Sequence, residues 1–437
     1  MQIIGIFLGF IILIFITYRN WSVYLATFLA SAVVILFSGL PLIQTLTQSY
    51  IGGIGAIFSS LLGMFMFSSV MAKLYAVSGA ASSISLTLCN TFLKKNQSEG
   101  KKQTLGLLIV IFASALMCYG GINAAIVIIT IYPISLIVFE QCDIPKRFIP
   151  GVILGGSVTF ALSGPGVPQP TNMIPMQILE TPSYAGLIPG IIGMIVEIVV
   201  IVGILNYIIT KARKSGEHFS YGTKDIVVAT DNKYPNFWIA LIPLVTLFIM
   251  FNVFELDIMI CTLISSLVSL ILFYPYLEKS QIKSHVNDGF VSALLPVGSI
   301  GAVFGFATVV QEVPAFQSII NSIIQLDINP YLLSVIAVAF LCSLTGGSTT
   351  GQAIVLPIIR PILEGMGMTP LVLHRIAAFS ATTIDSLPHS GTILMTVNHT
   401  DLKMKDAYPS IFITTTLATI AGTSVVTLLL YFFPGLA

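Results

Sequence analysis

The chain has 437 residues, of which 56% are hydrophobic and only 8% are charged, and its formal net charge is +1. Soluble domains carry roughly 25% charged residues, so this composition excludes an ordinary soluble protein. The near-neutral charge gives no basis for nucleic-acid binding. A lipid bilayer is the solvent that accepts such an apolar exterior, and we therefore expect an all-α polytopic membrane protein.

About ten segments are long and apolar enough to cross a bilayer, since a spanning helix needs about 20 predominantly apolar residues. In chain order they are residues 2–18, 21–39, 51–72, 148–180, 185–210, 236–254, 256–275, 288–311, 370–398 and 407–433. The first apolar run ends at Tyr18-Arg19 without a small-residue cleavage site. We interpret it as a retained span and not as a signal peptide.

Two further apolar stretches, 104–139 and 330–365, are too long to be single spans. Each is interrupted in its middle by a cluster of small residues that contains a Gly-Gly pair. We interpret both stretches as re-entrant hairpins, which enter and leave the membrane on the same face. Neither hairpin then reverses the orientation of the spans that follow it.

The basic residues support this arrangement. With the N-terminus outside, every Lys and Arg except Arg360 and Arg375 falls in a loop on the inner side, as the positive-inside rule requires. Counting either hairpin as a full span would reverse everything downstream and destroy this partition. We therefore predict a multi-pass protein of the bacterial inner membrane with both termini outside.

The two halves of the chain resemble each other. Gly120-Gly121 recurs 226 residues later as Gly346-Gly347, and Ser163-Gly164 recurs 227 residues later as Ser390-Gly391. Each half places a hairpin, a basic turn and a broken span in the same order, and the predicted topology makes the two halves inverted repeats. Many secondary transporters are built from inverted repeats with broken helices, which meet at a substrate site near the midplane. The alternative is a chance alignment of Gly-rich apolar helices.

This organisation predicts four parts of the chain. They are N-terminal scaffold helices (1–50), a first repeat (51–210) with hairpin 104–139 and broken helix 148–180, a cytoplasmic linker (211–235), and a second repeat (236–437) with hairpin 330–365 and broken helix 370–398.

The hairpin tips and the broken helices are the candidate substrate site. Backbone left unpaired at membrane depth survives only inside protein or beside a water-filled cavity, and a half-helix N-terminus attracts an anion. Hydroxyl and amide side chains at the breaks can bind a carboxylate or a polyol. The alternative is that the Gly-Gly pairs only allow close helix packing. The candidate binding residues are Gly120, Gly121, Asn123, Ser163, Gly164, Gly166, Gln169, Asn172, Gly346, Gly347, Ser348, Thr349, Thr350, Ser386, His389 and Ser390.

Ionisable residues inside a membrane are candidates for ion coupling. Asp385 and His389 stand four residues apart around Pro388, and a histidine beside a carboxylate suits a proton-coupled step. The alternative is that Asp385 only caps the half-helix that follows Pro388. Glu197 lies in an apolar run without a basic neighbour in sequence, where it either bonds across helices or carries a proton.

Two arginines stand apart from the basic inner loops. Arg360 and Arg375 either pair with a carboxylate substrate in an outward vestibule or anchor the protein at the membrane interface, and we favour the anchoring role.

Several enzyme signatures are absent from the sequence, among them HExxH, GxSxG, a Walker motif and GxGxxG after a strand. The five cysteines lie in or beside apolar stretches without CxxC spacing, so we interpret them as packing residues. We expect no catalytic residues, no metal and no cofactor.

The broken segments carry a family resemblance. The stretch Asp385-Ser386-Leu387-Pro388-His389-Ser390-Gly391, followed by Lys403-Met404-Lys405-Asp406-Ala407-Tyr408, resembles the gluconate permease (GntP) family of bacterial carboxylate:proton symporters, within the ion transporter superfamily. Ser163-Gly164-Pro165-Gly166 with Pro168, Gln169 and Asn172 is similar to the family's first-repeat counterpart. The resemblance covers roughly residues 100–437 and is weak before them.

The resemblance implies proton-coupled uptake of a sugar acid or a short hydroxy- or keto-carboxylate by a homodimer. Gluconate-specific members carry another sequence where this chain has Leu387-Pro388-His389, so a smaller monocarboxylate is equally compatible. The coupling ion is a proton or sodium. A cation/proton antiporter on a related fold is the alternative function, ranked lower because intramembrane carboxylates are few. A membrane-embedded enzyme or a channel explains less of the pattern.

Overall fold

A computed structural model describes residues 1–19, 21–94, 96–122, 124–222, 225, 234–316, 318, 328–345, 347–388 and 390–437. This part of the chain is helical and contains no β-strand. Within it, six helical stretches are long and apolar enough to cross a membrane, and four shorter apolar helices accompany them. The expectation of an all-α, multi-pass membrane protein is therefore confirmed.

The first half of the chain forms both short and long helices. They are α1 (Gln2–Tyr18), α2 (Val23–Ser38), α3 (Leu42–Thr45), η1 (Leu46–Tyr50), α4 (Ile51–Ser78), α5 (Ala80–Phe92), α6 (Glu99–Tyr119), α7 (Ala124–Cys142), η2 (Lys146–Phe148), α8 (Ile149–Leu154), η3 (Gly155–Phe160), α9 (Ala161–Ser163), α10 (Pro170–Leu179) and α11 (Leu187–Lys214).

The second half of the chain is also helical. Its helices are α12 (Phe237–Asn252), α13 (Ile258–Phe273), η4 (Tyr274–Tyr276), η5 (Lys279–Gln281), α14 (Ile282–Ser292), α15 (Leu294–Glu312), α17 (Pro330–Thr345), α18 (Ser348–Gly365), α19 (Pro370–Ser380), α20 (Gly391–His399), α21 (Met404–Phe412), η6 (Ile413–Leu417), α22 (Ala418–Phe432) and η7 (Pro434–Leu436).

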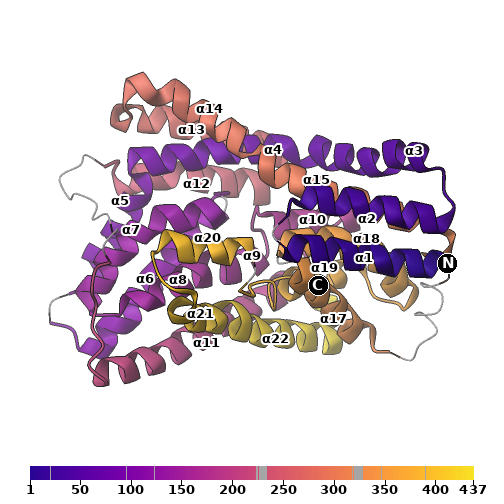
Figure 1. The fold of residues 1–437 in the computed structure, drawn as a ribbon. Helices are drawn as coiled ribbons and strands as arrows, with labels where there is room; N and C mark the ends of the chain where they lie inside the picture. Colours follow the sequence, from indigo (N-terminus) through magenta and orange to yellow (C-terminus); the bar gives the residue numbers. More distant parts are fainter. Residues whose placement is uncertain are drawn as a thin grey trace.

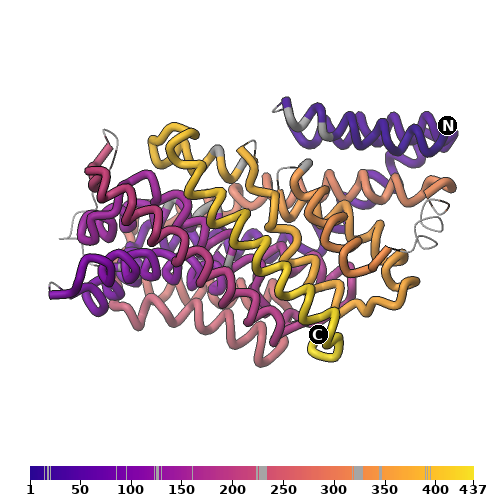
Figure 2. Tube along the Cα trace, turned by 90° about the horizontal axis from the view of Figure 1, so that it is seen from below, coloured from indigo at the N-terminus to yellow at the C-terminus, as the bar shows by residue number. Residues whose placement is uncertain are grey.

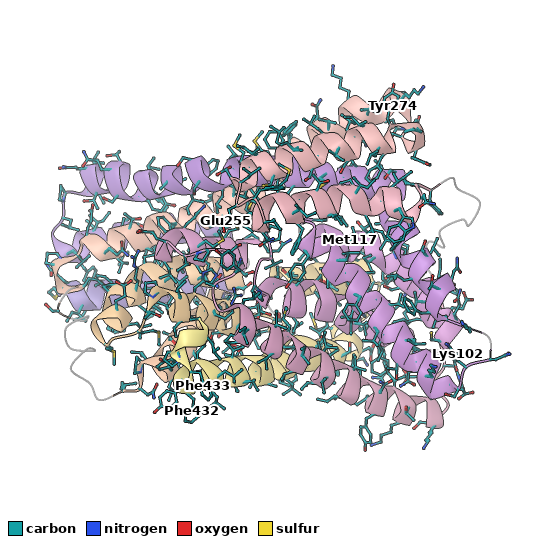
Figure 3. All side chains as sticks on the ribbon, turned by 180° about the vertical axis from the view of Figure 1, so that it is seen from behind. Lys102, Met117, Glu255, Tyr274, Phe432 and Phe433 are labelled. Carbon is teal, nitrogen blue, oxygen red and sulfur yellow. The ribbon has the colours of Figure 1, made fainter. Side chains whose placement is uncertain are left out.

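Two helical hairpins lie at opposite ends of the molecule (Figures 1 and 2). In the first, formed by α6 and α7, Arg213 bridges the two open ends, with its guanidinium 3.1 Å from Glu99 and 3.4 Å from Asp143. Figure 3 shows Lys102, near the start of α6, at the outer end and Met117, near the tip, closer to the middle. The first hairpin therefore opens at the end of the bundle where α11 terminates.

The second hairpin, α17 and α18, opens the other way. The Tyr331 ring at the start of α17 packs edge-on against Tyr431 near the end of α22, with centroids 5.4 Å apart. Inside this hairpin, a Cβ added at Gly351 would lie 2.4 Å from the Cα of Cys342, so only glycine permits the two helices to come this close. The two hairpins thus point their tips toward each other.

Two helices are broken between the hairpins. The first ends at Ser163 and resumes at Pro170, and the second ends at Ser380 and resumes at Gly391. Proline favours the first position of a helix because it has no N–H to leave unpaired, which explains why α10 begins at Pro170. Both breaks fall inside the predicted broken helices 148–180 and 370–398.

The N-terminal helices α1 and α2 pack on the outer side of α15. Their buried side chains, such as Leu13 and Val34, form one apolar cluster with Val303 and Phe306. The Phe10 and Phe306 rings meet edge-on with centroids 5.2 Å apart. In Figure 2 these helices lie to one side of the two hairpins, where they can brace α15 without contributing to the breaks.

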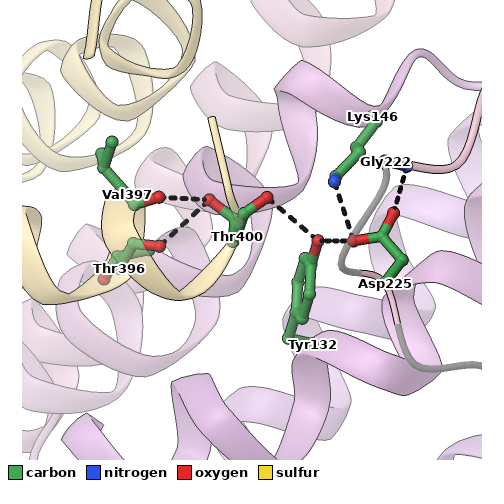
Figure 4. Close-up of polar contacts among 7 residues, drawn as sticks. All are labelled: Tyr132, Lys146, Gly222, Asp225, Thr396, Val397 and Thr400. Carbon is green, nitrogen blue, oxygen red and sulfur yellow. Dashed lines mark hydrogen bonds and ion pairs between the residues drawn. The ribbon is translucent and has the colours of Figure 1, made fainter. Parts of the chain in front are cut away.

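A polar cluster joins the linker to both halves (Figure 4). The carboxylate of Asp225 accepts hydrogen bonds from the Lys146 ammonium at 2.8 Å and the Tyr132 hydroxyl at 2.6 Å. The same hydroxyl lies 3.1 Å from the carbonyl oxygen of Thr400, just beyond α20. The predicted linker therefore touches the first hairpin and, through Tyr132, the second broken helix.

Some elements differ from the expected spans. Helix α5 was not expected, because its Ser, Thr and Asn residues make it too polar for a span by composition. Helix α4 joins α3 and η1 in a stretch of 37 residues (Leu42–Ser78), longer than the expected 51–72. The predicted spans 148–180 and 370–398 consist of short helices that pack in the interior.

The crossing of α4 and α15 generates the first prediction. A Cβ at Gly305 would lie 2.4 Å from the backbone oxygen of Tyr50, whereas one at Gly52 would meet nothing within 4 Å. Overpacking of this kind costs roughly 1–3 kcal/mol. We expect Gly305→Ala to lower the thermal unfolding midpoint in lipid nanodiscs and Gly52→Ala to leave it unchanged. Equal midpoints for the two variants would contradict the close crossing.

Candidate functional site

The two breaks and the second hairpin tip enclose a cavity of about 240 Å³. Its wall combines residues from six separate regions of the sequence. They are Phe65, Ala124, Val158, Leu162, Gln169, Pro170, Thr171, Pro296, Ser299, Ile300, Gly347, Ser348, Thr349, Thr350, Asp385, Ser386, Ser390 and Thr392.

Three helices begin at this cavity. The residues that immediately precede α10, α18 and α20 are Gln169, Gly347 and Ser390, and all three line the wall. Helix N-termini carry a partial positive charge and N–H groups without intrahelical partners. The three starts therefore make this part of the interior favourable for negative charge.

Asp385 carries the only formal charge among the described residues of the wall. It is 5% exposed. Its carboxylate accepts a hydrogen bond from the Ser386 hydroxyl at 2.8 Å, and further hydrogen bonds from the hydroxyl and the backbone N–H of Ser348. Asp385 thus connects the second break to the N-terminus of α18. The alternative role considered from the sequence, a cap on the helix after Pro388, is wrong, because that helix begins at Gly391 with Ser390 as its cap residue.

Gln169 connects the first break to the first hairpin. Its side-chain amide donates to the carbonyl oxygens of Cys118 at 2.8 Å and Ile122 at 2.9 Å. These carbonyls lie at the end of α6, where intrahelical partners are lacking. In both halves, then, a residue of the break satisfies backbone groups at the tip of the neighbouring hairpin.

The predicted site residues separate into three groups. Those at the cavity are Gln169, Gly347, Ser348, Thr349, Thr350, Asp385, Ser386 and Ser390. Those that do not line it are Gly120, Gly121, Ser163, Gly164, Gly166, Asn172 and Glu197. Asn123, Gly346 and His389 lie outside the described residues.

The glycines of the second group pack against other helices. A Cβ at Gly120 or Gly121 would lie 2.1 Å or 2.6 Å from Leu244 or Leu247 of α12. A Cβ at Gly164 would lie 1.9 Å from the hydroxyl of Tyr119. Close packing, the alternative considered for the Gly-Gly pairs, describes the first pair in this conformation.

Ser163 and Asn172 belong to a second buried polar cluster around Arg375. The Arg375 guanidinium donates to the carbonyl oxygens of Ala185 at 2.7 Å and Ser163 at 2.8 Å. It also lies 3.4 Å from the side-chain oxygen of Asn172 and from the carbonyl oxygen of Ser183. This one side chain of the second half thus bonds backbone groups of the first break and of the connection between α10 and α11.

The expected roles of Arg375 are therefore wrong. Arg375 is 0% exposed, so it neither anchors the protein at an interface nor faces a vestibule. Arg360 remains near the surface, where it bonds Glu364 at 2.9 Å and lies 3.4 Å from Glu180. Counting basic residues in a sequence cannot distinguish a surface arginine from one that satisfies buried carbonyls.

Several wall residues were not anticipated from the sequence. Phe65 of α4 and Pro296, Ser299 and Ile300 of α15 line the cavity opposite the breaks. The proline in the first turn of α15 was the one available signal. Leu162 and Val158 come from turns just before the first break and look like ordinary apolar residues.

No group of three or more His, Cys, Asp or Glu residues that could hold a metal ion occurs in the described part of the chain. The chemistry of the wall comes from hydroxyls, one carboxylate, one amide and helix N-termini.

Comparisons with known proteins agree on the class of protein. The family model described as GntP family permease matches residues 1–256. An uncharacterized transporter of Bacillus subtilis strain 168, YxjC, is 25% identical over 98% of each chain. The crystal structure of the YdaH transporter of Alcanivorax borkumensis, whose topology is described as unusual, shares the fold with a TM-score of 0.58, 11% identity and 88% coverage of each chain. The matched range includes the first 100 residues, where the sequence resemblance was weak, and ends before the segment at Asp385.

The second buried cluster generates a prediction on stability. Arg375→Met leaves at least two buried carbonyl oxygens without their donor, and each orphaned acceptor costs about 1–3 kcal/mol. We expect a loss of unfolding free energy on the order of 3 kcal/mol, measured as a lower thermal midpoint in nanodiscs. Arg360→Met is the matched control: it removes the exposed contacts with Glu180 and Glu364, worth at most about 1 kcal/mol each, and a bond to the Ile178 carbonyl near the surface, where water can replace the lost donor. A similar small effect in both variants would contradict the cross-linking role of Arg375.

Proposed function

This chain belongs to the GntP permease family, and on that premise we propose that it is a secondary active transporter that carries a small organic acid together with a proton. The observation that carries the proposal is the convergence of three helix N-termini and the buried Asp385 on one partly open cavity. The elements that meet there come from both halves of the chain, as expected for a transporter whose site lies between repeats.

The substrate class follows from the chemistry of the wall. Helix N-termini favour a carboxylate. The hydroxyls of Ser348, Thr349, Thr350 and Ser386 offer donors and acceptors to hydroxyl groups of the solute. Pockets for drug-sized ligands occupy roughly 300–1,000 Å³, and a cavity of about 240 Å³ suits a smaller solute. A sugar acid or a short hydroxy- or keto-monocarboxylate meets all three conditions.

The need for a coupling ion follows from Asp385. A substrate carboxylate that enters the cavity approaches a second carboxylate in a region shielded from water, where like charges repel strongly. A proton bound at Asp385 removes this repulsion, and sodium ligated there would reduce it. Binding of anion and cation is therefore cooperative, which is the physical basis of symport.

The proposed topology places both hairpins as re-entrant elements of two inverted repeats. The first hairpin opens at the end of the bundle that carries Arg213, Lys146 and Arg147, and the second opens at the opposite end. Basic residues favour the cytoplasmic side, so the first hairpin enters from inside, and both termini lie outside the inner membrane. We further propose that the transporter is a homodimer and that each chain contains its own substrate cavity.

The decisive experiment is uptake of labelled gluconate, lactate and 3-hydroxybutyrate into proteoliposomes with an imposed inward proton gradient, in the presence and absence of sodium. We expect accumulation of at least one acid that a protonophore abolishes and that sodium does not alter. Accumulation that requires sodium would assign sodium as the coupling ion. If no acid accumulates under the proton gradient, with or without sodium, the cation/proton antiporter would be favoured.

Asp385→Asn tests the coupling role. The amide keeps the shape of the side chain but cannot bind a proton, so we expect gradient-driven uptake to be lost while substrate exchange at equal pH persists. Asp288→Asn is the control, because its carboxylate is 57% exposed and pairs with Lys73 at 3.7 Å. Unimpaired accumulation against a gradient in Asp385→Asn would rule out coupling at this residue.

Gly347→Leu tests the position of the site. A Cβ at Gly347 would meet only the Thr350 hydroxyl, at 3.7 Å, so a larger side chain can extend into the cavity without a backbone clash. We expect the affinity for the transported acid to fall more than about tenfold, equivalent to about 1.4 kcal/mol, with Gly347→Ala much less affected. Normal affinity of the leucine variant in a binding measurement would place the substrate elsewhere.

A further inference from the structure

Glu197 is a buried carboxyl outside the cavity. It lies on α11, is 0% exposed, and packs against α22, where a Cβ at Gly422 would lie 2.7 Å from its Oε1. Its Oε2 lies 3.3 Å from the Ser163 hydroxyl oxygen, whose own hydrogen is donated to the Thr159 carbonyl oxygen at 2.8 Å. Its Oε1 has no hydrogen-bond partner in the described part of the chain.

Glu197 and Asp385 are both buried carboxyls, but their surroundings are opposite. Asp385 accepts hydrogen bonds from two hydroxyls and two backbone N–H groups, the kind of donor set that an ionised carboxylate needs. Glu197 has only the Ser163 hydroxyl within hydrogen-bond distance in the described chain, and that hydroxyl donates to Thr159 at the shorter distance of 2.8 Å. No Lys, Arg or His of the described chain lies within ion-pair distance of Glu197. Leaving a charged carboxylate so poorly satisfied in the interior is costly, whereas a neutral carboxylic acid fits.

The charged and titratable groups that face Glu197 are few. Arg375 of α19 lies on the other side of Ser163, with its guanidinium donating to the Ser163 carbonyl at 2.8 Å. Tyr119 of α6 donates to the Met194 sulfur at 3.1 Å, one turn before Glu197. On α22, Gly422 presents no side chain. Ser163 therefore separates a buried cation from a buried carboxyl and bonds both.

We propose that Glu197 is a second proton-binding site, separate from the substrate cavity, and that it holds its proton in the conformation described. This inference rests on the proposed function. In another stage of the cycle the O–H bond breaks and the proton passes to water, which leaves a carboxylate. The Ser163 hydroxyl, which here donates to the Thr159 carbonyl at 2.8 Å, then turns to donate to that carboxylate.

The route from Glu197 to the cavity is short. Ser163 ends α9, and the residue before it, Leu162, lines the cavity. The Leu162 carbonyl accepts a hydrogen bond from the Thr171 hydroxyl at 2.8 Å, and Thr171 lines the cavity across the break. Because Leu162 is the neighbour of Ser163 in the chain, a change in the hydrogen bonds of Ser163 can shift a residue of the cavity wall.

The first test needs no substrate. Infrared spectra of the purified protein in lipid, recorded across a pH series, report the C=O stretch of a protonated carboxyl. We expect a band at neutral pH that is absent from Glu197→Gln and remains in Asp385→Asn and in Glu180→Gln, whose carboxyl is exposed. A band that persists in Glu197→Gln, or its absence from the unmodified protein, would overturn the proposal.

The second test separates proton binding from a structural role. In proteoliposomes with a gradient of about one pH unit, each coupled proton supports up to about tenfold accumulation. Glu197→Gln keeps the shape of the side chain, so we expect exchange of the transported acid at equal pH within about twofold of normal and accumulation reduced by up to about tenfold. Unchanged accumulation would show that Glu197 carries no coupled proton. If none of the probe acids is transported by the unmodified protein, the proposed function fails while the infrared result stands by itself.

Discussion

Backbone groups at the two helix breaks have to find partners inside the protein, and the rest of the structure depends on this constraint. The first break leaves the carbonyl of Ser163 and the connection from α10 to α11 leaves those of Ser183 and Ala185, and Arg375 from the other half reaches all three. At the hairpin tips, Gln169 donates to two backbone carbonyls of the first hairpin, and Asp385 accepts from a backbone N–H of the second. Because the partners come from the opposite side of each gap, the breaks are held at defined positions and the cavity between them has a defined wall.

This constraint separates the two buried polar regions by task. Around the cavity, hydroxyls and helix N-termini leave hydrogen-bonding capacity that a solute can use. Around Arg375, the polar groups satisfy one another, and His374 contributes by bonding Thr181 at 2.6 Å and Asn172 at 2.9 Å. A transporter needs both kinds of region, since one must exchange its partner in every cycle and the other must preserve the architecture while that happens.

Much of the architecture could be predicted from the sequence, because small residues and prolines in long apolar runs have few structural solutions. The hairpin tips, the positions of both breaks and the meeting of Gln169, Ser348 and Asp385 follow from that pattern. The burial of Arg375 could not be predicted, since an arginine near a turn reads as a surface residue until its carbonyl acceptors are known. The wall residues of α4 and α15 could not be predicted either, because in a sequence Phe65 and Ile300 cannot be distinguished from apolar residues that face lipid. Gly120 and Gly121 show the opposite error: they were predicted to bind substrate because both hairpins carry a Gly-Gly pair, but in the first hairpin this pair packs against α12.

The bonds of Arg375 also have a consequence for how the protein is made. Arg375 follows Ser163 by 212 residues, and a nascent chain enters the membrane in the order of its synthesis. The first half is therefore inserted with the carbonyls of its break still without the donor that completes them. Maturation of the interior has to wait until α19 arrives from the ribosome. A fragment that ends after α11 is accordingly an unfinished folding intermediate and not a smaller version of the transporter, and any division of the gene between the repeats would require both products to assemble in the same membrane.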